Sequence, residues 1–249
     1  MTIMTVVITG GSRGIGLEIA RAFVCANYHV VVGARNFTEG LKVMGSTVQF
    51  IETDVRCETA HVHLVNTALN QTGRIDCYIN NAGYSAWRPI DKIDEVFLDE
   101  LLATNLKGAF WGCKAAASVM RDGASIINIS SIAGKRGSLN NSAYCASKFG
   151  MNGLTQALAK ELGSRGVRVN AVCPVLIPTE GLLMALQDSY APAGGNPEKF
   201  MAGFAKANAA LNRLPTGSEV AATCLYLASN AASAITGQCI NVDCGVFPQ

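Results

Sequence analysis

Short apolar runs rich in valine and isoleucine alternate with longer helix-like stretches along this chain. The strand-like runs cover residues 4–9, 29–34, 47–53, 77–80, 125–130, 167–173 and 238–242. The helix-like stretches cover residues 14–27, 37–45, 57–72, 95–120, 142–164 and 216–229. Such alternation is typical of a parallel sheet that helices cover on both faces. We therefore predict an α/β fold with a doubly wound parallel sheet of about seven strands.

The alternation is interrupted once, at residues 174–214, between the last two strands. Prolines and the Gly194–Gly195 pair divide this segment into short amphipathic pieces. Long connections in compact domains usually serve as lids or binding loops. This one leaves the carboxyl edge of the sheet, where such folds bind ligands. We predict a single domain over residues 1–249 with a substrate-binding insertion, or lid, at about 175–214.

The composition argues against several classes of protein. The 249 residues include 20 Lys and Arg against 18 Asp and Glu, and 49% are hydrophobic. A nucleic-acid-binding protein needs a basic stripe and a disordered chain has few apolar residues, so neither class fits. The apolar runs fall short of the roughly 20 residues that cross a bilayer, and residues 1–5 lack the basic region of a signal peptide. We expect a cytoplasmic protein without nucleic-acid or membrane partners.

The nine cysteines are odd in number and show no Cys-x-x-Cys spacing. Most of them lie in apolar segments, where cysteine behaves as a small hydrophobic residue. The three histidines, His29, His61 and His63, have no zinc-type spacing with them. We therefore expect reduced thiols and no metal site.

A glycine-rich segment, Thr9-Gly10-Gly11-Ser12-Arg13-Gly14-Ile15-Gly16, joins the first strand to the first helix. Glycines let the backbone approach a pyrophosphate closely, and a helix N-terminus attracts an anion. A plain strand-to-helix turn is the alternative, but this context favours a Rossmann-type dinucleotide site. The residues predicted to bind the dinucleotide here are Gly10, Ser12, Arg13, Gly14, Ile15 and Gly16.

Three motifs in order carry a family resemblance. The glycines follow a Gly-x3-Gly-x-Gly spacing, Asn80-Asn81-Ala82-Gly83 follows the fourth strand, and Tyr144-x3-Lys148 stands further along. With these motifs the chain resembles the short-chain dehydrogenase/reductase family from Met4 to Gly245. The resemblance implies further cofactor contacts from Asp54, Val55, Asn81, Ala82, Gly83, Tyr144, Lys148, Pro174, Ile177 and Thr179. For Asp54, which would bond the adenine amine, the alternative is an N-cap for the helix beginning near Cys57.

The end of the second strand indicates which nicotinamide cofactor is used. An acidic residue there bonds the ribose 2′-hydroxyl of NAD, but this chain has Ala34 followed by Arg35. Arg35 and Arg13 suit a 2′-phosphate, because guanidinium groups bind phosphates through paired, charge-assisted hydrogen bonds. The alternative is that both are solvated surface charges. We predict NADP, used as NADPH.

Tyr144 and Lys148 are four residues apart in a helix-like stretch, so they share one face. The ammonium is expected to lower the pKa of the tyrosine, which then exchanges a proton with a carbonyl or alcohol oxygen. The resemblance adds Ser131, which holds the substrate oxygen, and Asn105, at a helix kink that supports a proton relay. Ser130 is the adjacent alternative to Ser131, and Asn105 is alternatively an ordinary mid-helix polar residue. The predicted catalytic residues are Asn105, Ser131, Tyr144 and Lys148.

The resemblance implies an NADP(H)-dependent oxidoreductase that reduces a carbonyl to an alcohol, or the reverse, with Tyr144 as general acid/base. Apolar residues expected around the cleft suit a neutral ketone or a 3-oxoacyl compound. The predicted substrate residues are Ser131, Trp87, Leu139, Leu182 and Leu183, with Ser85, Ala86, Ala133 and Leu186 as further lining candidates. Alternatively, the leucines only pack the insertion against the domain. A sugar or polyol dehydrogenase, a non-catalytic NADP-binding scaffold and an epimerase or dehydratase remain alternative functions.

The chain departs from the family pattern at two positions. Val175 follows Pro174 where relatives usually have glycine, and because valine avoids positive φ we expect the loop there to follow another path. Cys244 stands between Asp243 and Gly245, where a glycine is common, and this looks like a conservative loop change. The resemblance also implies that the helices at 95–120 and 142–164 pair across subunits, giving a homotetramer or homodimer.

Overall fold

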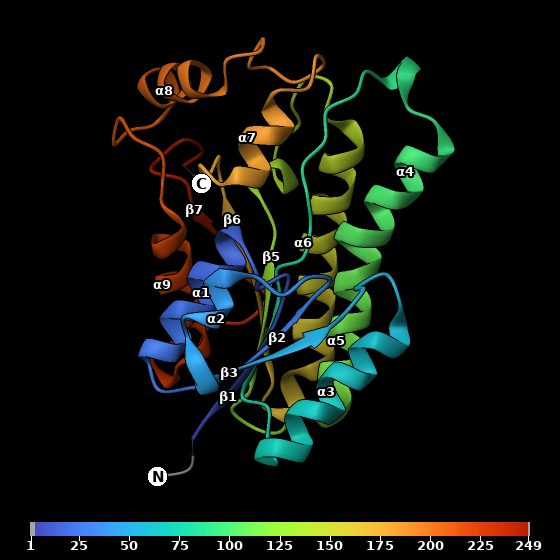
Figure 1. Ribbon diagram of the computed structural model, residues 1–249, viewed down its shortest axis with the longest axis vertical. Helices are drawn as coiled ribbons and strands as arrows, with labels where there is room; N and C mark the ends of the chain where they lie inside the picture. The colour runs from blue at the N-terminus through green and yellow to red at the C-terminus, as the bar shows by residue number, and fades with distance from the viewer. Residues whose placement is uncertain (1–2, 249) are drawn as a thin grey trace.

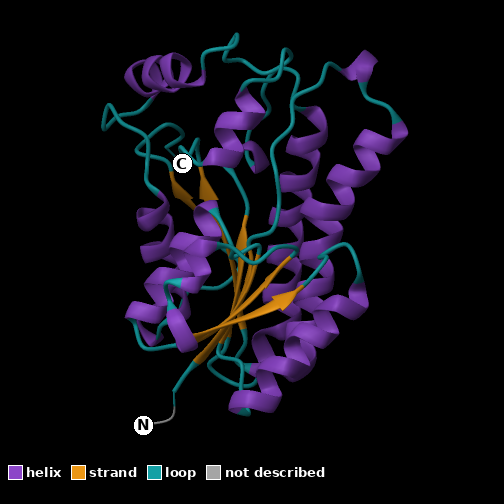
Figure 2. Cartoon of the chain, in the orientation of Figure 1, coloured by secondary structure: helices purple, strands orange, loops and turns teal. Residues whose placement is uncertain are grey.

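The computed structural model describes residues 3–248, which contain one parallel seven-stranded sheet (Figures 1 and 2). The strands are β1 (Thr5–Thr9), β2 (His29–Ala34), β3 (Val48–Glu52), β4 (Cys77–Asn80), β5 (Ser125–Ile129), β6 (Arg168–Pro174) and β7 (Cys239–Val242). Their order across the sheet is β3-β2-β1-β4-β5-β6-β7, and each neighbouring pair is parallel. The chain builds outward from β1 in one direction and continues from β4 in the other. This order confirms the predicted doubly wound α/β fold.

Helices cover both faces of the sheet, as Figure 1 shows. They are α1 (Gly14–Cys25), α2 (Glu39–Lys42), α3 (Glu58–Thr72), α4 (Glu95–Leu102), α5 (Gly108–Val119), α6 (Ser142–Leu162), α7 (Glu180–Leu186), α8 (Pro197–Asn208) and α9 (Gly217–Ala228). Helices α1, α2 and α9 pack on one face, and α3, α5 and α6 pack on the other. Within residues 3–248, none of these helices is long and apolar enough to span a membrane.

The observed elements begin and end close to the predicted positions, with two differences. The single helix predicted at residues 95–120 is two helices, α4 and α5, joined by a π-helical turn at Ala103–Lys107. The helix predicted at residues 37–45 is reduced to the short α2, which ends at Lys42 and is followed by a 3₁₀ turn at Gly45–Thr47. Both differences arise from backbone geometry that apolar periodicity does not report.

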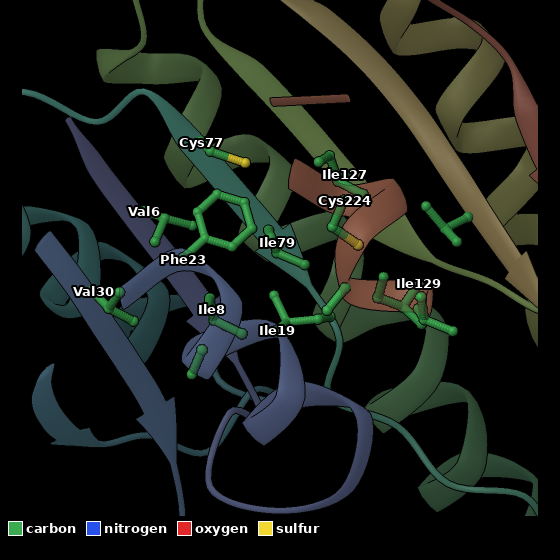
Figure 3. Close-up of a cluster of buried hydrophobic side chains, with 14 of the residues drawn as sticks. Val6, Ile8, Ile19, Phe23, Val30, Cys77, Ile79, Ile127, Ile129 and Cys224 are labelled. Carbon is green, nitrogen blue, oxygen red and sulfur yellow. The ribbon is translucent and has the colours of Figure 1, made fainter. Parts of the chain in front are cut away.

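The core between the sheet and helices α1 and α9 is almost wholly aliphatic (Figure 3). Ile19 and Phe23 of α1 and Cys224 of α9 are fully buried against side chains of β1 and β4, including Ile8 and Ile79. Burying one side chain of this size contributes about 1.5–3 kcal/mol. This packing holds the N-terminus of α1 at the carboxyl ends of the central strands.

A chain of buried amides and hydroxyls fixes α6 against the other face of the sheet. Asn80 Nδ2 donates to Asn128 Oδ1 at 2.9 Å, across the register pair of β4 and β5. Asn128 Nδ2 in turn donates to Thr155 Oγ1 of α6 at 2.9 Å. Buried polar groups are costly unless they are paired in this way. The position of α6, which carries Tyr144 and Lys148, is therefore set by directional bonds as well as by apolar contact.

The segment between β6 and α9 contains α7 and α8, which Figure 1 shows beyond the carboxyl ends of β6 and β7. It has its own small core, in which Leu186 of α7 and Met201 of α8 pack with Trp87 from the loop after β4. Ala191, from the connection between α7 and α8, completes this core. This cluster anchors the segment over the carboxyl edge of the sheet.

Candidate active site

The loops that follow β1, β4, β5 and β6 all lie at the carboxyl edge of the sheet. β1 and β4 are neighbours although two strands intervene in the sequence. Doubly wound folds bind ligands in the crevice beside such a pair, where the strand order reverses. The glycine loop follows β1 and the Asn81–Gly83 segment follows β4, so the topology brings two of the sequence motifs together there.

The glycine loop has almost no room for side chains. Gly10 takes a φ of 65°, and a Cβ there would lie 2.8 Å from the Cα of Ala82. A Cβ on Gly16 would lie 2.3 Å from the carbonyl oxygen of Gly10. Ser12 of this loop is buried, and the exposed Arg13 directly precedes α1. The loop therefore lies tightly on the first turn of α1 and leaves that helix N-terminus able to meet an anion.

Asn81 fastens the glycine loop to the loop after β4. Its Nδ2 donates to the carbonyl oxygens of Thr9 and Gly10, each at 3.0 Å. In return, Thr9 Oγ1 accepts from the backbone N–H groups of Asn81 and Ala82 at 3.1 and 3.2 Å. The resemblance predicted only a contact between Asn81 and the cofactor. The structure shows that the Asn81 side chain also holds the glycine loop in place.

The end of β2 leads to an arginine-rich edge of the site. Ala34 is buried and Arg35 is exposed. Asp54, after β3, pairs with Arg56, whose Nη2 lies 2.6 Å from Asp54 Oδ2. Hydrogen bonding by Arg56, with a smaller contribution from the Arg35 charge, lowers the pKa of Asp54. The N-cap of α3 is Cys57, so the alternative interpretation of Asp54 as that cap is wrong.

Tyr144 lies in the first turn of α6, and its hydroxyl contacts two serines. Burial raises the pKa of Tyr144, while hydrogen bonds with the Ser85 and Ser131 side chains oppose the increase. The net direction is opposite to the sequence-based expectation, because loss of water around the phenolate outweighs the stabilising contacts. Ser85 was predicted only to line the cleft. Its contact with Tyr144 depends on the path of the loop after β4, and the available signal was a hydroxyl residue just after Asn-Asn-Ala-Gly.

Ser131 and Ser130 point to different surroundings. Ser131 Oγ accepts from the backbone N–H of Ala133 at 3.1 Å and donates to the carbonyl oxygen of Pro174 at 3.4 Å. Ser130 is buried, and its Oγ donates to the backbone carbonyl of Lys148 at 3.4 Å. Only Ser131 of the two contacts the Tyr144 hydroxyl. The geometry therefore favours Ser131 over Ser130 as the residue beside a reacting oxygen.

Lys148 lies one helical turn after Tyr144 and is only 4% exposed. Its Nζ donates to the carbonyl oxygen of Ile129 at 2.8 Å and lies 5.8 Å from the centre of the Tyr144 ring. Burial lowers the pKa of Lys148 to about 8. The buried ammonium thus lies over the tyrosine ring.

Asn105 lies in the π-helical turn between α4 and α5 and is fully buried. Its Oδ1 accepts from the backbone N–H of Tyr84 at 3.0 Å, and its Nδ2 donates to the carbonyl of Tyr84 at 2.9 Å. A π turn widens the helix locally and is frequent at functional sites. Asn105 is therefore not an ordinary mid-helix residue, because it ties this turn to the loop that carries Ser85.

The segment after β6 faces the glycine loop across a cleft of about 360 Å³. Ile177 is buried in the core. Thr179 caps α7 by accepting from the backbone N–H of Leu182 at 3.3 Å. A Cβ on Gly14 would lie 3.4 Å from the Thr179 methyl group. Both predicted contact residues of this segment therefore border the site, although the Thr179 hydroxyl already serves a helix cap.

The two departures from the family pattern behave differently. Val175 keeps a negative φ, and its N–H donates to Val242 O at 3.4 Å, which continues the pairing of β6 with β7. Cys244 takes a φ of 54°, in the left-handed region that favours glycine. The expectation that this was a conservative loop change is therefore wrong, since a side chain occupies a backbone conformation that costs roughly 1–2 kcal/mol.

The predicted substrate residues divide into two groups. Trp87 is buried in the cluster of the α7–α8 segment, and Leu182 and Leu183 pack partly against that cluster. These contacts match the alternative in which the apolar side chains pack the insertion. Leu139 is 86% exposed and lies outside that cluster. Burial of these loop side chains separates the two groups, and composition does not report it.

Comparison with known proteins agrees with this geometry. A family profile described as Enoyl-(Acyl carrier protein) reductase matches residues 10–247. A 3-oxoacyl-(acyl-carrier-protein) reductase FabG from Chlamydia muridarum is 35% identical over 250 residues, which cover 96% of each chain. The chain belongs to the short-chain dehydrogenase/reductase family.

Solved structures of short-chain dehydrogenase/reductase enzymes share the whole fold. The aldohexose dehydrogenase of Thermoplasma acidophilum is 30% identical with a TM-score of 0.88, covering 99% of this chain and 98% of its own. A variant of actinorhodin polyketide ketoreductase, determined with NADPH, is 31% identical with a TM-score of 0.87 over 98% and 97% of the two chains. The glycine loop, the Asn-Asn-Ala-Gly segment and the Tyr-x3-Lys pair all lie inside the matched region.

Proposed function

We propose that this protein is an NADP(H)-dependent oxidoreductase that reduces a ketone to a secondary alcohol, or catalyses the reverse reaction. The observation that carries the proposal is the convergence of three groups at the carboxyl edge of the sheet. The Tyr144 phenol contacts Ser131, and the Lys148 ammonium lies over the tyrosine ring. These groups come from β5 and α6, beside the glycine loop. A proton donor, an oxyanion-stabilising hydroxyl and a buried cation are what carbonyl reduction requires of the protein.

The residues present fit a dinucleotide phosphate. The glycine loop leaves no space for side chains at Gly10 and Gly16, and the N-terminus of α1 supplies backbone N–H groups to a pyrophosphate. Arg35, with Arg13, would hold a 2′-phosphate where NAD-binding proteins have an acid. The NADPH in the actinorhodin ketoreductase structure supports this choice. The remaining proposed cofactor residues are Ser12, Gly14, Ile15, Asp54, Val55, Asn81, Ala82, Gly83, Tyr144, Lys148, Pro174, Ile177 and Thr179.

Bound NADPH supplies a hydride to the carbonyl carbon. Tyr144 gives its phenolic proton to the carbonyl oxygen, and its raised pKa keeps it protonated and ready to donate at neutral pH. Ser131 donates a hydrogen bond to the same oxygen and stabilises the negative charge that develops there. Lys148, with a pKa of about 8, is charged on most molecules at pH 7 and stabilises the phenolate after transfer. Asn105 holds the Tyr84 backbone and thereby the loop that carries Ser85.

The substrate class proposed is a neutral ketone or a 3-oxoacyl compound. The α7–α8 segment presents a mainly apolar cluster to the carboxyl edge, which suits an uncharged ligand. The FabG relative and the polyketide ketoreductase both bear names of carbonyl reductases. A sugar dehydrogenase is the second candidate, because the aldohexose dehydrogenase matches the chain equally well. A non-catalytic scaffold is disfavoured, since Asn105, Ser131, Tyr144 and Lys148 are all present and occupy one region.

The test is oxidation of NADPH, with NADH in parallel, by the purified protein. Candidate substrates are an acetoacetyl thioester, cyclic and aliphatic ketones, quinones and keto-sugars, and the reverse reaction is measured with aldohexoses and NADP⁺. We expect turnover with NADPH and a ketone or 3-oxoacyl compound. Faster turnover with NADH would contradict the role of Arg35, and turnover of aldohexoses alone would select the sugar dehydrogenase.

Two matched tyrosine variants separate catalysis from folding. Tyr144→Phe removes the proton donor, and we expect turnover to fall by about 10²–10⁴-fold while NADPH binding is retained. Tyr226→Phe changes an exposed tyrosine on α9 and should leave turnover unchanged. NADPH binding without turnover of any substrate in wild type would favour the scaffold alternative. Equal turnover in wild type and Tyr144→Phe would refute the assigned mechanism.

A further inference from the structure

Val175 and Cys244, the two departures from the family pattern, lie in one small apolar cluster that the proposed reaction does not use. Its members come from four segments that are far apart in the chain: the turn after β5, the residue after β6, α8 with its C-terminal end, and the C-terminal segment. This Ile132 cluster consists of Ile132, Val175, Phe204, Ala209, Cys244 and Val246. It therefore joins the α8 part of the insertion and the C-terminal segment to the turn that follows Ser131.

The hydroxyl of Ser131 lies between two backbone groups that adjoin this cluster. Ser131 directly precedes Ile132, and its Oγ accepts from the backbone N–H of Ala133 at 3.1 Å. The same hydroxyl donates to the carbonyl oxygen of Pro174, the residue before Val175, at 3.4 Å. Because O–H···O bonds are usually about 2.7–2.8 Å long, this proton is held loosely and is readily given to a substrate oxygen. The turn after β5 and the end of β6 therefore set where the hydroxyl lies.

The C-terminal segment folds back so that Val246 reaches the same cluster. Both carboxylate oxygens of Asp243 accept backbone hydrogen bonds, from the N–H of Gly245 at 3.0 Å and from that of Phe247 at 2.9 Å. Within this turn, Cys244 takes its left-handed φ of 54°. Strained backbone of this kind persists where the surrounding structure over-determines it. Here the strained turn places Val246, which is only 8% exposed, in the apolar cluster.

We propose that Val175 and Val246 are positioning residues for Ser131, a role that rests on the proposed function of that serine. The side chain of Val246 supports the turn whose N–H the hydroxyl accepts, and Val175 supports the carbonyl to which the hydroxyl donates. Truncation of either side chain leaves a gap into which these backbone groups relax. The Ser131 hydroxyl then shifts relative to the substrate oxygen. The glycine loop lies outside this cluster, so NADPH binding is retained.

The first test compares kcat of wild type with that of Val175→Ala and of Val246→Ala, using the ketone that wild type reduces fastest. We expect each variant to lose about tenfold to a hundredfold in kcat, since displacement of a reacting group by about 1 Å has effects of that size. The Kd for NADPH and the KM for the ketone should stay as in wild type. Val246→Ile keeps a branched apolar side chain and should retain most of the turnover. Wild-type kcat in both alanine variants would overturn the proposal.

A matched valine variant separates positioning from a general loss of stability. Val65 of α3 is 2% exposed in the core between that helix and the sheet, so Val65→Ala makes the same truncation outside the Ile132 cluster. We expect Val65→Ala to lower Tm at least as much as Val246→Ala does, and to leave kcat unchanged at temperatures well below Tm. An equal fall of kcat in Val65→Ala would show a general effect of destabilisation and contradict the proposal.

A double-mutant cycle tests whether Val246 acts through Ser131. Ser131→Ala removes the hydroxyl, and single-turnover measurements with the protein in excess follow its slower oxidation of NADPH. Val246→Ala should cost no further rate in the Ser131→Ala background, because no hydroxyl is left to position. A purely structural role predicts the same fold loss in both backgrounds, and that result would refute the coupling to Ser131.

Hydrogen exchange distinguishes a failure of this inference from a failure of the proposed function, because it needs no substrate. The Ala133 amide is bonded to Ser131 Oγ, and mass spectrometry follows the peptide that contains both residues. We expect this peptide to exchange severalfold faster in Val175→Ala and Val246→Ala than in wild type or Val65→Ala, since a loosened turn opens more often. Faster exchange together with a wild type that turns over no substrate would refute the proposed function and leave the support of the turn standing. Unchanged exchange would refute the inference itself.

Discussion

Burial, more than charge pairing, sets the protonation of Tyr144 and Lys148, the two titrating residues of the proposed catalytic group. Tyr144 and Lys148 share one face of α6, as their spacing predicts, yet the pKa of Tyr144 is raised and that of Lys148 is lowered. In both cases the first cause is loss of water around the charged form. The consequence at the scale of single residues is that Tyr144 keeps its proton at neutral pH and Lys148 carries a charge that folding makes costly.

The cost of burying Lys148 predicts a pH-dependent stability. Its pKa falls from the usual 10.5 to about 8 on folding, so between these values the unfolded chain binds a proton that the folded chain has released. The free energy of unfolding therefore rises as the pH increases from about 8 to 10.5. We expect wild type to gain up to about 3 kcal/mol over this window relative to Lys148→Met. Urea unfolding at several pH values measures it.

An exposed lysine of the same helix supplies the control for this measurement. Lys160→Met removes a solvated charge from α6, and its difference from wild type should stay constant over the same pH range. A difference between wild type and Lys148→Met that is also independent of pH would show that Lys148 keeps its proton on folding, contrary to the prediction.

The glycine loop works as an element because it packs against two others. Asn81, from the loop after β4, donates to the carbonyl oxygens of Thr9 and Gly10 at the start of the glycine loop. At the end of the loop, a Cβ on Gly16 would lie 2.3 Å from the Gly10 carbonyl oxygen. Two loops that are far apart in the sequence are therefore fastened to each other at the N-terminus of α1. The π-helical turn at Asn105 performs the same function for the loop that carries Ser85.

Two glycine-to-alanine changes test whether the loop is as tight as its geometry indicates. Gly16→Ala places a methyl group 2.3 Å from the Gly10 carbonyl oxygen, and overpacking of this kind costs roughly 1–3 kcal/mol of stability. We expect that loss together with weaker NADPH binding. Gly203→Ala in α8 meets no atom within 4 Å and should stabilise the protein by about 0.5–1 kcal/mol. Chemical denaturation and NADPH titration measure both, and a neutral Gly16→Ala would contradict the close packing described.

At the scale of the whole molecule, the strand order decides where function is located. The four loops of the site come from β1, β4, β5 and β6, which are adjacent in the sheet although they are spread over more than half of the sequence. The two cores on opposite faces of the sheet hold these strands in register. A ligand bound at this edge therefore contacts loops from four strands, and we expect it to raise the free energy of unfolding of the whole domain.

A thermal unfolding series tests this global coupling and the choice of cofactor. At a concentration of about 100 times Kd, a ligand adds about 2.7 kcal/mol to the stability. For a chain of this size that raises Tm by roughly 5–10 °C. We expect such a shift with NADPH, a smaller one with NADH at the same concentration, and a reduced NADPH shift in Arg35→Ser. Equal shifts with the two cofactors in wild type would contradict the assignment of Arg35 to the 2′-phosphate.

Much of the architecture follows from patterns that are local in the sequence. Each strand and helices α1, α3, α6 and α9 were predicted to within two residues of their observed ends, because apolar periodicity reflects burial directly. The glycine loop and the Tyr144–Lys148 pair were also recognisable, since their spacing is set by one turn or one helix. The π-helical turn, the Asp54–Arg56 pair and the contact of Ser85 with Tyr144 were not predicted. Each of these depends on a backbone path or on a partner from another loop.

The amino-acid sequence alone determined the α/β fold class, the order of elements and the residue types available for hydride-transfer chemistry. These properties come from periodicity and from motifs that short stretches of chain contain in full. Only the tertiary structure decided the direction of the Tyr144 pKa shift and the burial of Trp87 beside the exposure of Leu139. Those properties depend on water exclusion and on contacts between segments far apart in the chain. They exist only once the strands have taken their places beside one another.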